Sequence, residues 1–312
     1  MQTDTYIKSN HVATIMPDLY RLLLNSGQVA IPRGRVTLEV TDVKIVLTNI
    51  QNNIFTDPRR DLNYRFMVAE FIWIMMGRMG LEFLTRYNPK IREFSDDGQT
   101  LRGAYGPRVM DQLPHVLNTL AEDPASRQAV INLWQDSPTP SKDIPCTLSL
   151  QFLIRDGQLH LIITMRSSDA WLGIPYDIYN FSMIQNCVAG ALRKNTRAPH
   201  TQETWEFFED HPTLGTLTLN LGSSHLYIKD AGKVTHLLEQ RNFPISTHVP
   251  SPQLPGLPPG YIFNPIIDSI VLPIISPLIN KPEHMVWKLY ERALYAKNKK
   301  ECLEVLHEAQ NA

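Results

Sequence analysis

Neither sign of charge dominates this sequence of 312 residues. Charged side chains make up 20% of the chain, and the formal net charge is -1. A protein that holds the phosphate backbone of DNA or RNA presents a strongly basic face, and this balance provides none. The composition therefore argues against intact nucleic acid as a partner.

Cysteine is scarce. The chain has three, Cys146, Cys187 and Cys302, and no two of them form a CxxC pair. A disulfide framework or a cysteine-ligated zinc site needs more thiols at closer spacing. No metal is expected, and a cysteine with a function is expected to act as a free thiol.

Long apolar runs are absent as well. No stretch approaches the ~20 apolar residues that cross a bilayer. The first twenty residues lack the basic, apolar and small-residue blocks of a signal peptide. We therefore expect a cytoplasmic protein with no membrane partner.

The sequence does contain enough apolar residues, 43% of the chain, for a large core, and their patterns predict both strands and helices. Residues 36–50 alternate and are rich in β-branched side chains, which favours strands. Apolar residues spaced by three and four from Asn63 to about Tyr87 indicate a largely buried helix that includes Glu70. Further strands are predicted at 131–135, 147–167 and 216–228, a turn region at 95–107, and helices at 111–123, 178–194 and 284–310.

Residues 244–283 hold much of the proline and suggest an irregular connection with short edge strands. Strands and helices in this order indicate an α+β or mixed α/β domain.

The chemistry concentrates in the middle of the chain. Cys146 follows a proline at the start of a predicted strand, which could hold its sulfur exposed and fixed in direction. A thiol held in this way can act as a nucleophile, although a lone cysteine at a strand end is more often a small core residue. Twenty residues later, Arg166 and Ser167 combine a guanidinium fork with a hydroxyl, a donor set that suits a phosphate.

Three strings in this region, PCTLSLQF, MRSSDAWLGIPYDI and GSSHLY, resemble the thymidylate synthase family in order and spacing. The resemblance extends upstream to AEFIWIMMG, GAYG, DPASRQ and IPRGR. It covers roughly residues 20–230 and leaves a divergent C-terminal region at about 244–312. It implies one α+β catalytic domain over 1–312, a mixed sheet covered by helices, assembled as a two-fold homodimer packed through the sheet.

The resemblance also implies a reaction and a site. In this family a cysteine adds to carbon 6 of a pyrimidine nucleoside monophosphate, so that carbon 5 can attack a one-carbon unit carried by 5,10-methylenetetrahydrofolate. The residues that match the family's motifs are, for catalysis, Cys146, Glu70, Asp177 and Tyr105; for the phosphate, Arg33, Arg166, Ser167 and, from the neighbouring subunit, Arg127; for the sugar, His225 and Tyr227; and for the folate, Asp169, Leu172, Gly173 and Tyr176.

Glu70 suits the role of general acid and base because burial raises the pKa of a carboxyl toward neutrality. Without the family, a surface-facing or salt-bridged glutamate is the alternative. One departure weakens the phosphate site, since Gln128 stands where the family has a second arginine after Arg127.

Asp177 is the departure that bears on the substrate. The synthase has an asparagine here, whose amide donates to oxygen 4 of uracil and accepts from the N3 hydrogen. An ionised carboxylate only accepts, which matches the 4-amino group and protonated N3 of cytosine once Cys146 has added. Thr147 and Met165 replace a histidine and a glutamine of the synthase, and the strings around them resemble phage deoxycytidylate hydroxymethylases.

Residues 90–106 contain no tryptophan, although the synthase has a tryptophan-rich shield there. A less shielded intermediate should react with water instead of hydride. We therefore predict 5-hydroxymethylation of dCMP, with the ribose nucleotide CMP as the alternative substrate. The expected location is the cytoplasm or, for a phage enzyme, the host cytoplasm. The other interpretations are a dCMP methylase or thymidylate synthase that ends in hydride transfer, and a pyrimidine-nucleotide-binding module without catalysis.

Overall fold

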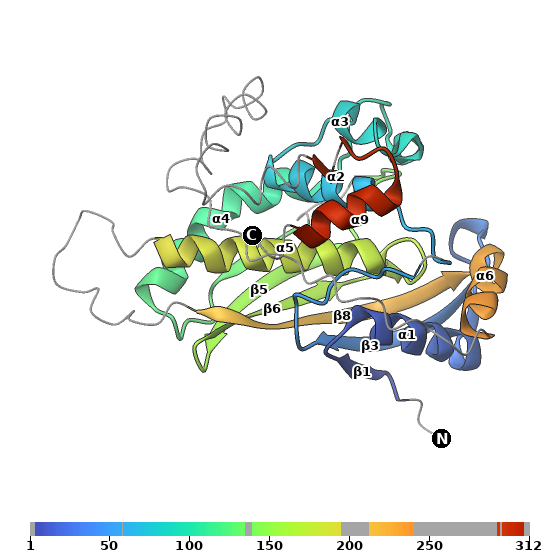
Figure 1. Ribbon diagram of the computed structural model, residues 1–312, viewed down its shortest axis with the longest axis horizontal. Helices are drawn as coiled ribbons and strands as arrows, with labels where there is room; N and C mark the ends of the chain where they lie inside the picture. Colours follow the sequence, from blue (N-terminus) through green and yellow to red (C-terminus); the bar gives the residue numbers. More distant parts are fainter. Residues whose placement is uncertain are drawn as a thin grey trace.

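The computed structural model describes residues 4–57, 59–134, 139–194, 212–239, 292–293 and 295–308 (Figure 1). The strands are β1 (Tyr6–Ser9), β2 (Gln28–Ala30), β3 (Thr37–Leu47), β4 (Val130–Asn132), β5 (Thr147–Arg155), β6 (Gln158–Met165), β7 (Ser168–Asp169) and β8 (Thr213–Tyr227). The helices are α1 (Val12–Ser26), α2 (Tyr64–Met75), α3 (Glu82–Thr85), α4 (Tyr105–Glu122), α5 (Ile174–Lys194), α6 (Ile228–Glu239) and α9 (Lys299–Glu308), with short 3-10 turns η1 (Pro32–Gly34) and η2 (Pro89–Phe94).

The strands form one mixed eight-stranded sheet. Its order is β1-β3-β8-β6-β5-β4, with β2 added beside β3 and β7 beside β8. The long strand β8 runs antiparallel to β3 and parallel to both β6 and β7. Strand β8 pairs with β3, β6 and β7. It therefore brings the end of β6 and the start of α5 close to the residues that follow β2.

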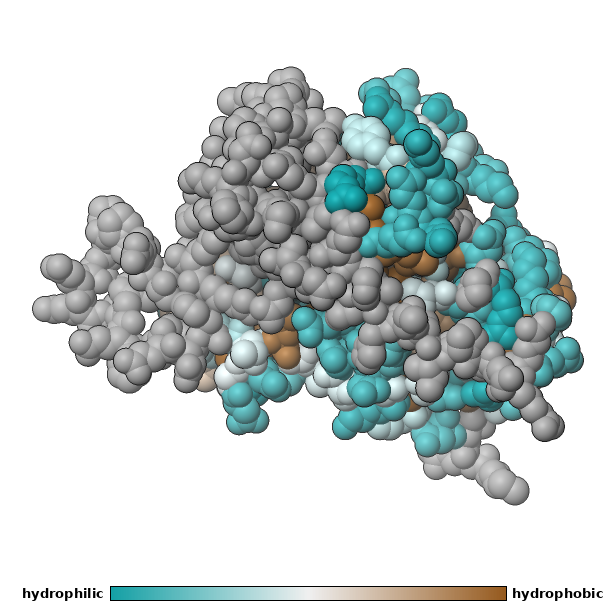
Figure 2. Space-filling model, in the orientation of Figure 1, coloured by the Kyte–Doolittle hydropathy of each residue, from teal (hydrophilic) through white to brown (hydrophobic). Residues whose placement is uncertain are grey.

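Helix α5 lies along the sheet, with α2 and α4 stacked on it and α3 and α9 on the same side (Figure 1). From Ile178 to Leu192 every residue of α5 is buried. A helix that is apolar all round is typical of a position between two layers. On the face that Figure 2 shows, the described surface over α3 and α9 is mostly hydrophilic, as expected for the outer layer.

The predicted α+β class and mixed sheet are confirmed, and so are the long strands: β3, β5 and β6 fall in the expected ranges, and β8 begins three residues earlier than expected, at Thr213. The helix expected from Asn63 to about Tyr87 is wrong in length, because α2 ends at Met75. Gly77 follows in the left-handed region (φ 64°), and its N–H bonds to the Ile74 carbonyl at 2.9 Å. Glycine takes this conformation at little cost, so the chain turns there.

Residues 105–107 are helical and not part of a turn, because α4 begins at Tyr105. Two helices were not anticipated, α1 and α6. The proline-rich stretch 244–283 lies outside the described residues, and of the helix expected over 284–310 the structure describes α9. No helix within the described ranges is long and apolar enough to cross a membrane.

Candidate active site

Cys146 directly precedes β5 and is half-buried. Arg166, at the end of β6, holds the preceding turn: its Nε donates to the Pro145 carbonyl (2.9 Å) and its Nη2 to the Ile144 carbonyl (3.0 Å). The same Nη2 lies 3.8 Å from Cys146 Sγ. The sulfur is thus fixed by the guanidinium rather than by the proline alone.

Burial raises the pKa of the Cys146 thiol, while the charges of Arg166 and Arg33 oppose that shift. Arg33 reaches this site from η1, where its backbone takes the left-handed conformation (φ 52°, ψ 36°) that non-glycine residues seldom adopt. Its side chain is exposed. The charges of two arginines therefore act on the sulfur, and they favour its thiolate form.

A second group of polar residues lies where β7 pairs with β8. This pairing sets Asp169 opposite His225, and Ser167 Oγ lies 3.3 Å from His225 Nδ1. The rings of His225 and Tyr227 meet edge to face, with their centroids 5.4 Å apart. Burial lowers the pKa of His225, so this ring is neutral near pH 7 and can act as a donor or an acceptor.

Asp169 also fixes the start of α5. Its Oδ1 accepts from the backbone N–H groups of Trp171 (2.8 Å) and Leu172 (3.1 Å). Gly173 follows, and a Cβ there would lie 3.0 Å from the Asp169 carbonyl oxygen, so no side chain fits without displacement. Leu172 is left 51% exposed, which makes it an apolar surface at the edge of the site.

Asp177 is in the first turn of α5, and Ser168 Oγ donates to its Oδ2 at 3.3 Å. Burial, followed by the negative charge of Glu70, raises the pKa of Asp177 to about 8. Burial also raises the pKa of Glu70, to about 7, against a hydrogen bond from Asn180 Nδ2 (2.7 Å). Burial disfavours the ionisation of both carboxyls, and the charge of Glu70 adds to this at Asp177, so at neutral pH the pair holds a proton that it can transfer.

Tyr105, the first residue of α4, contacts Thr147, the residue after Cys146. Its ring stacks on Phe181 of α5 (6.2 Å between centroids, 19° between planes). Its hydroxyl accepts from the Thr147 backbone N–H (3.3 Å) and the Thr147 hydroxyl (3.0 Å). Burial and the charges of Asp177 and Cys146 raise the pKa of Tyr105, so the hydroxyl stays protonated and can donate a hydrogen bond at the site.

Tyr176 and Arg127, both expected at the site, make their hydrogen bonds outside the group around Cys146. The Tyr176 hydroxyl accepts from the Asn63 N–H (3.1 Å) at the start of α2, so this side chain joins α5 to α2. Arg127 lies in the loop before the edge strand β4, and its carbonyl accepts from Gln151 Nε2 (3.1 Å). Its own side chain is exposed, and no described contact joins it to the residues around Cys146.

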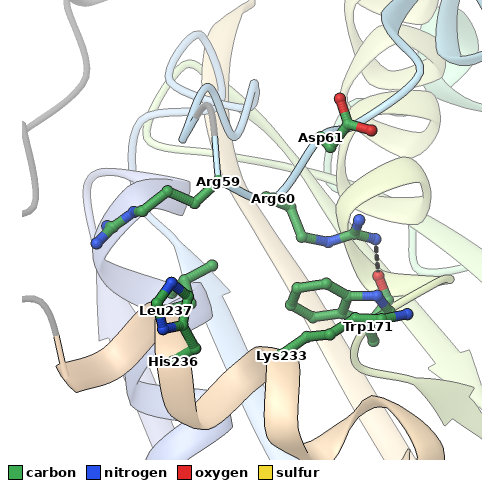
Figure 3. Close-up of a pocket in the computed structure, with 7 residues that line it drawn as sticks. All are labelled: Arg59, Arg60, Asp61, Trp171, Lys233, His236 and Leu237. Atoms are coloured by element: carbon green, nitrogen blue, oxygen red, sulfur yellow. Dashed lines mark hydrogen bonds between the residues drawn. The ribbon is translucent and has the colours of Figure 1, made fainter.

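The structure adds two residues that the sequence did not indicate, Ser168 and Asn180, which bond to the two carboxyls. It also shows a pocket near Trp171 that is lined mostly by charged residues. The pocket encloses about 340 Å³. It is lined by Arg59, Arg60, Asp61, Trp171, Lys233, His236 and Leu237 (Figure 3). Arg60 lies over the Trp171 ring, 4.0 Å from its centroid, and donates to the Trp171 carbonyl. The charged run DPRRD at 57–61 was the available signal.

The Asp177 carboxyl predicts how stability depends on pH. A carboxyl whose folded pKa is raised stabilises the fold fully below its unfolded pKa of about 4, and this stability is lost as pH rises toward about 8. Asp177→Asn removes the ionisable group. We expect the variant to melt higher than the parent at pH 8, by roughly 3 °C or more, with a smaller difference at pH 5. Thermal unfolding followed by circular dichroism at both pH values checks this, and an equal difference at both would contradict it.

The fold, together with a cysteine before β5, an Arg-Ser pair after β6 and a carboxyl in the first turn of α5, defines the class. The chain belongs to the thymidylate synthase family, whose model, described as "Thymidylate synthase", matches residues 15–251.

Two curated relatives carry the same description, deoxyuridylate hydroxymethyltransferase. The relative from Bacillus phage SP01 is 31% identical over 245 residues, which is 72% of this chain and 59% of the relative. The relative from Pseudomonas phage M6 is 31% identical over 197 residues, 60% of this chain and 56% of the relative. The matched part of this chain spans less than two thirds of the length of either relative.

Proposed function

We propose that this protein transfers a one-carbon unit to carbon 5 of a cytidine monophosphate, with dCMP preferred to CMP and 5-hydroxymethyl-(d)CMP as the product. The observation that carries the proposal is the Asp177 carboxyl, half-buried in the first turn of α5 and close enough to influence the pKa of both Cys146 and Tyr105. An amide here would match uracil, whereas a carboxyl that gives up its proton matches cytosine.

The residues would act in sequence. Cys146 would add its sulfur to carbon 6 of the ring, which makes carbon 5 nucleophilic. Asp177 would pass its proton to N3 and then accept hydrogen bonds from N3–H and the 4-amino group. Bound 5,10-methylenetetrahydrofolate would supply the one-carbon unit. Glu70 would take the proton from carbon 5, directly or through water, as the bond between the one-carbon unit and tetrahydrofolate breaks and tetrahydrofolate leaves. Water would then add to the one-carbon unit, and release of Cys146 from carbon 6 would free the product.

Hydroxymethylation of deoxyuridylate is the second candidate, because both relatives are described by that activity. The raised pKa of Asp177, about 8, is compatible with it. A protonated carboxyl both donates and accepts, as oxygen 4 and N3–H of uracil require. Cytidylate takes precedence because only cytosine has an N3 that can accept the Asp177 proton.

The arrangement of polar residues around Cys146 supports a proposal for the remaining nucleotide contacts. Arg33, Arg166 and Ser167 would hold the 5′-phosphate, since two cations and a hydroxyl form a donor set for an anion. His225 and Tyr227, on β8 next to Ser167, would bond the 3′-hydroxyl of the sugar.

We propose a two-fold homodimer in which Arg127 completes the phosphate site of the neighbouring subunit. On β6 the buried side chains alternate with half-buried ones, Ile162 among them, so the outer face of the sheet is incompletely covered within one chain. Arg127 is exposed at the edge of that sheet. A chain that remains fully active as a monomer in dilute solution would contradict this arrangement.

The folate would lie against the start of α5, at Asp169, Leu172, Gly173 and Tyr176. Exposed Leu172 offers an apolar contact there. The pocket of Figure 3 begins at the neighbouring Trp171, and its arginines and lysine would suit the carboxylates of the folate's glutamate tail.

A nucleotide panel tests the proposal. The protein is incubated with methylenetetrahydrofolate and dCMP, CMP, dUMP or UMP, and the products are identified by mass spectrometry. We expect a hydroxymethyl product from dCMP and release of tetrahydrofolate. A bare methyl group together with dihydrofolate would instead indicate hydride transfer. Tight nucleotide binding with no tritium released from carbon 5 would indicate a binding module.

A further inference from the structure

Asn180 of α5 and Glu70 of α2 form a hydrogen bond between two buried helices. The Asn180 side-chain nitrogen lies 2.7 Å from Glu70 Oε2, and Asn180 is only 4% exposed. An ionised carboxylate only accepts hydrogen bonds, so the amide must present its nitrogen end to it. The contact therefore stabilises the charged form of Glu70.

Asn180 is also placed to act together with Asp177. Residues three apart on a helix lie on the same face, so both side chains project from one side of the first turns of α5. Glu70 contributes to the raised pKa of Asp177 and receives the hydrogen bond of Asn180. One face of α5 thus meets Glu70 with both a carboxyl and an amide.

The elements that pack against α2 bring other ionisable groups to it. Among them are Tyr176 and Asp177 on α5, Tyr105 on α4, Cys302 on α9, Glu82 on α3 and Arg86 just after α3. Glu82 and Arg86 form an exposed pair with each other, and Cys302 faces Arg65 at the start of α2. Among the described residues, two effects set the pKa of Glu70: burial raises it, and the hydrogen bond from Asn180 lowers it.

We propose that Asn180 is a positioning residue that orients the Glu70 carboxylate and keeps it ionised when it must take a proton. The inference deepens the proposed function and rests on it for the role of Glu70 as the base. It does not depend on which pyrimidine is the substrate.

The test measures Glu70 directly and needs no turnover. Protein labelled with carbon-13 at the glutamate carboxyl is titrated by NMR, and Glu70→Gln identifies the signal of Glu70. We expect a midpoint near pH 7 in the parent, from the raised pKa of Glu70. In Asn180→Leu, which has no donor, the midpoint should move up by about one pH unit, and in Asn180→Ser, which keeps a shorter donor, by less.

Gln185→Met is the matched control. Gln185 is a fully buried amide on the same helix, and it donates to the Leu159 carbonyl at 2.7 Å, away from the carboxyls. Its loss should lower the melting temperature without moving the Glu70 midpoint. If Asn180→Leu does not fold, Asn180→Ser decides the question. A midpoint unchanged in the folded Asn180 variants overturns the proposal.

The catalytic readout separates this inference from the proposed function. With the nucleotide that the parent uses, the rise in tritium release from carbon 5 with pH should move upward in Asn180→Leu by the same interval as the NMR midpoint. If the parent releases tritium from no nucleotide, the proposed function fails, while the NMR titration still decides the role of Asn180.

Discussion

Replacing Asp177 by asparagine is expected to reverse the base preference of the protein. The amide would donate to oxygen 4 and accept from N3–H of uracil, but it has no proton to give to N3 of cytosine. A site matched to one polar pattern rejects another strongly because buried groups are left unpaired. We expect the ratio of kcat/KM for dCMP to that for dUMP to fall by at least ~100-fold.

Steady-state kinetics with both nucleotides measures this ratio. Asp18→Asn is the control, because Asp18 pairs with Arg21 on the surface of α1 and the same chemical change there should leave the ratio alone. Ser168→Ala provides a graded variant, since it removes only the 3.3 Å hydrogen bond to the Asp177 carboxyl. An Asp177→Asn protein with the parental ratio would mean that another residue reads the base.

Loss of Glu70 is expected to slow carbon 5 chemistry more than nucleotide binding. A positioned general acid and base contributes ~10²–10⁴-fold, so Glu70→Gln should reduce tritium release from carbon 5 by a factor in that range. Cys146→Ser should bring it to background, since exchange requires addition at carbon 6. Nucleotide affinity, measured by calorimetry, should change little in either variant.

Cys187→Ser is the matched control for the nucleophile. Cys187 is buried on α5, and burial raises the pKa of its thiol to about 12, so it stays protonated. The variant should lose stability and keep its exchange rate per folded molecule. Exchange that persists in Cys146→Ser would remove the cysteine from the mechanism.

The strands that carry the site can be predicted from the alternation of apolar and polar residues in the sequence. Buried residues alternate in β6, and period-two alternation is a local property that a sequence exposes. The break in the helix after Met75 was missed because the apolar spacing continues past it. There Gly77 ends the helix through its backbone conformation, which apolar spacing does not record.

The candidate site shows the same division. Cys146, Glu70 and Asp177 were expected from motif strings, whereas Asn180 was not, because an amide inside a buried helix has no local signature. The role proposed for Asn180 depends on its contact with Glu70, which lies 110 positions earlier in the chain. The role of Arg166 in holding the Pro145 carbonyl is likewise visible only once β5 and β6 are paired.

Asp177 and Cys146 lie on different elements of the fold, so the substrate could change while the nucleophile stays in place. In the proposed function, the sulfur lies before β5 and the base would lie on α2, while the residue that would read the ring lies on α5, supported by Ser168 from β7. The residue that would choose the ring and the cysteine that would attack it thus lie on separate elements of the chain. A small combinatorial library at positions 168 and 177 could therefore explore new pyrimidines while leaving Cys146 and the Asn180–Glu70 hydrogen bond in place.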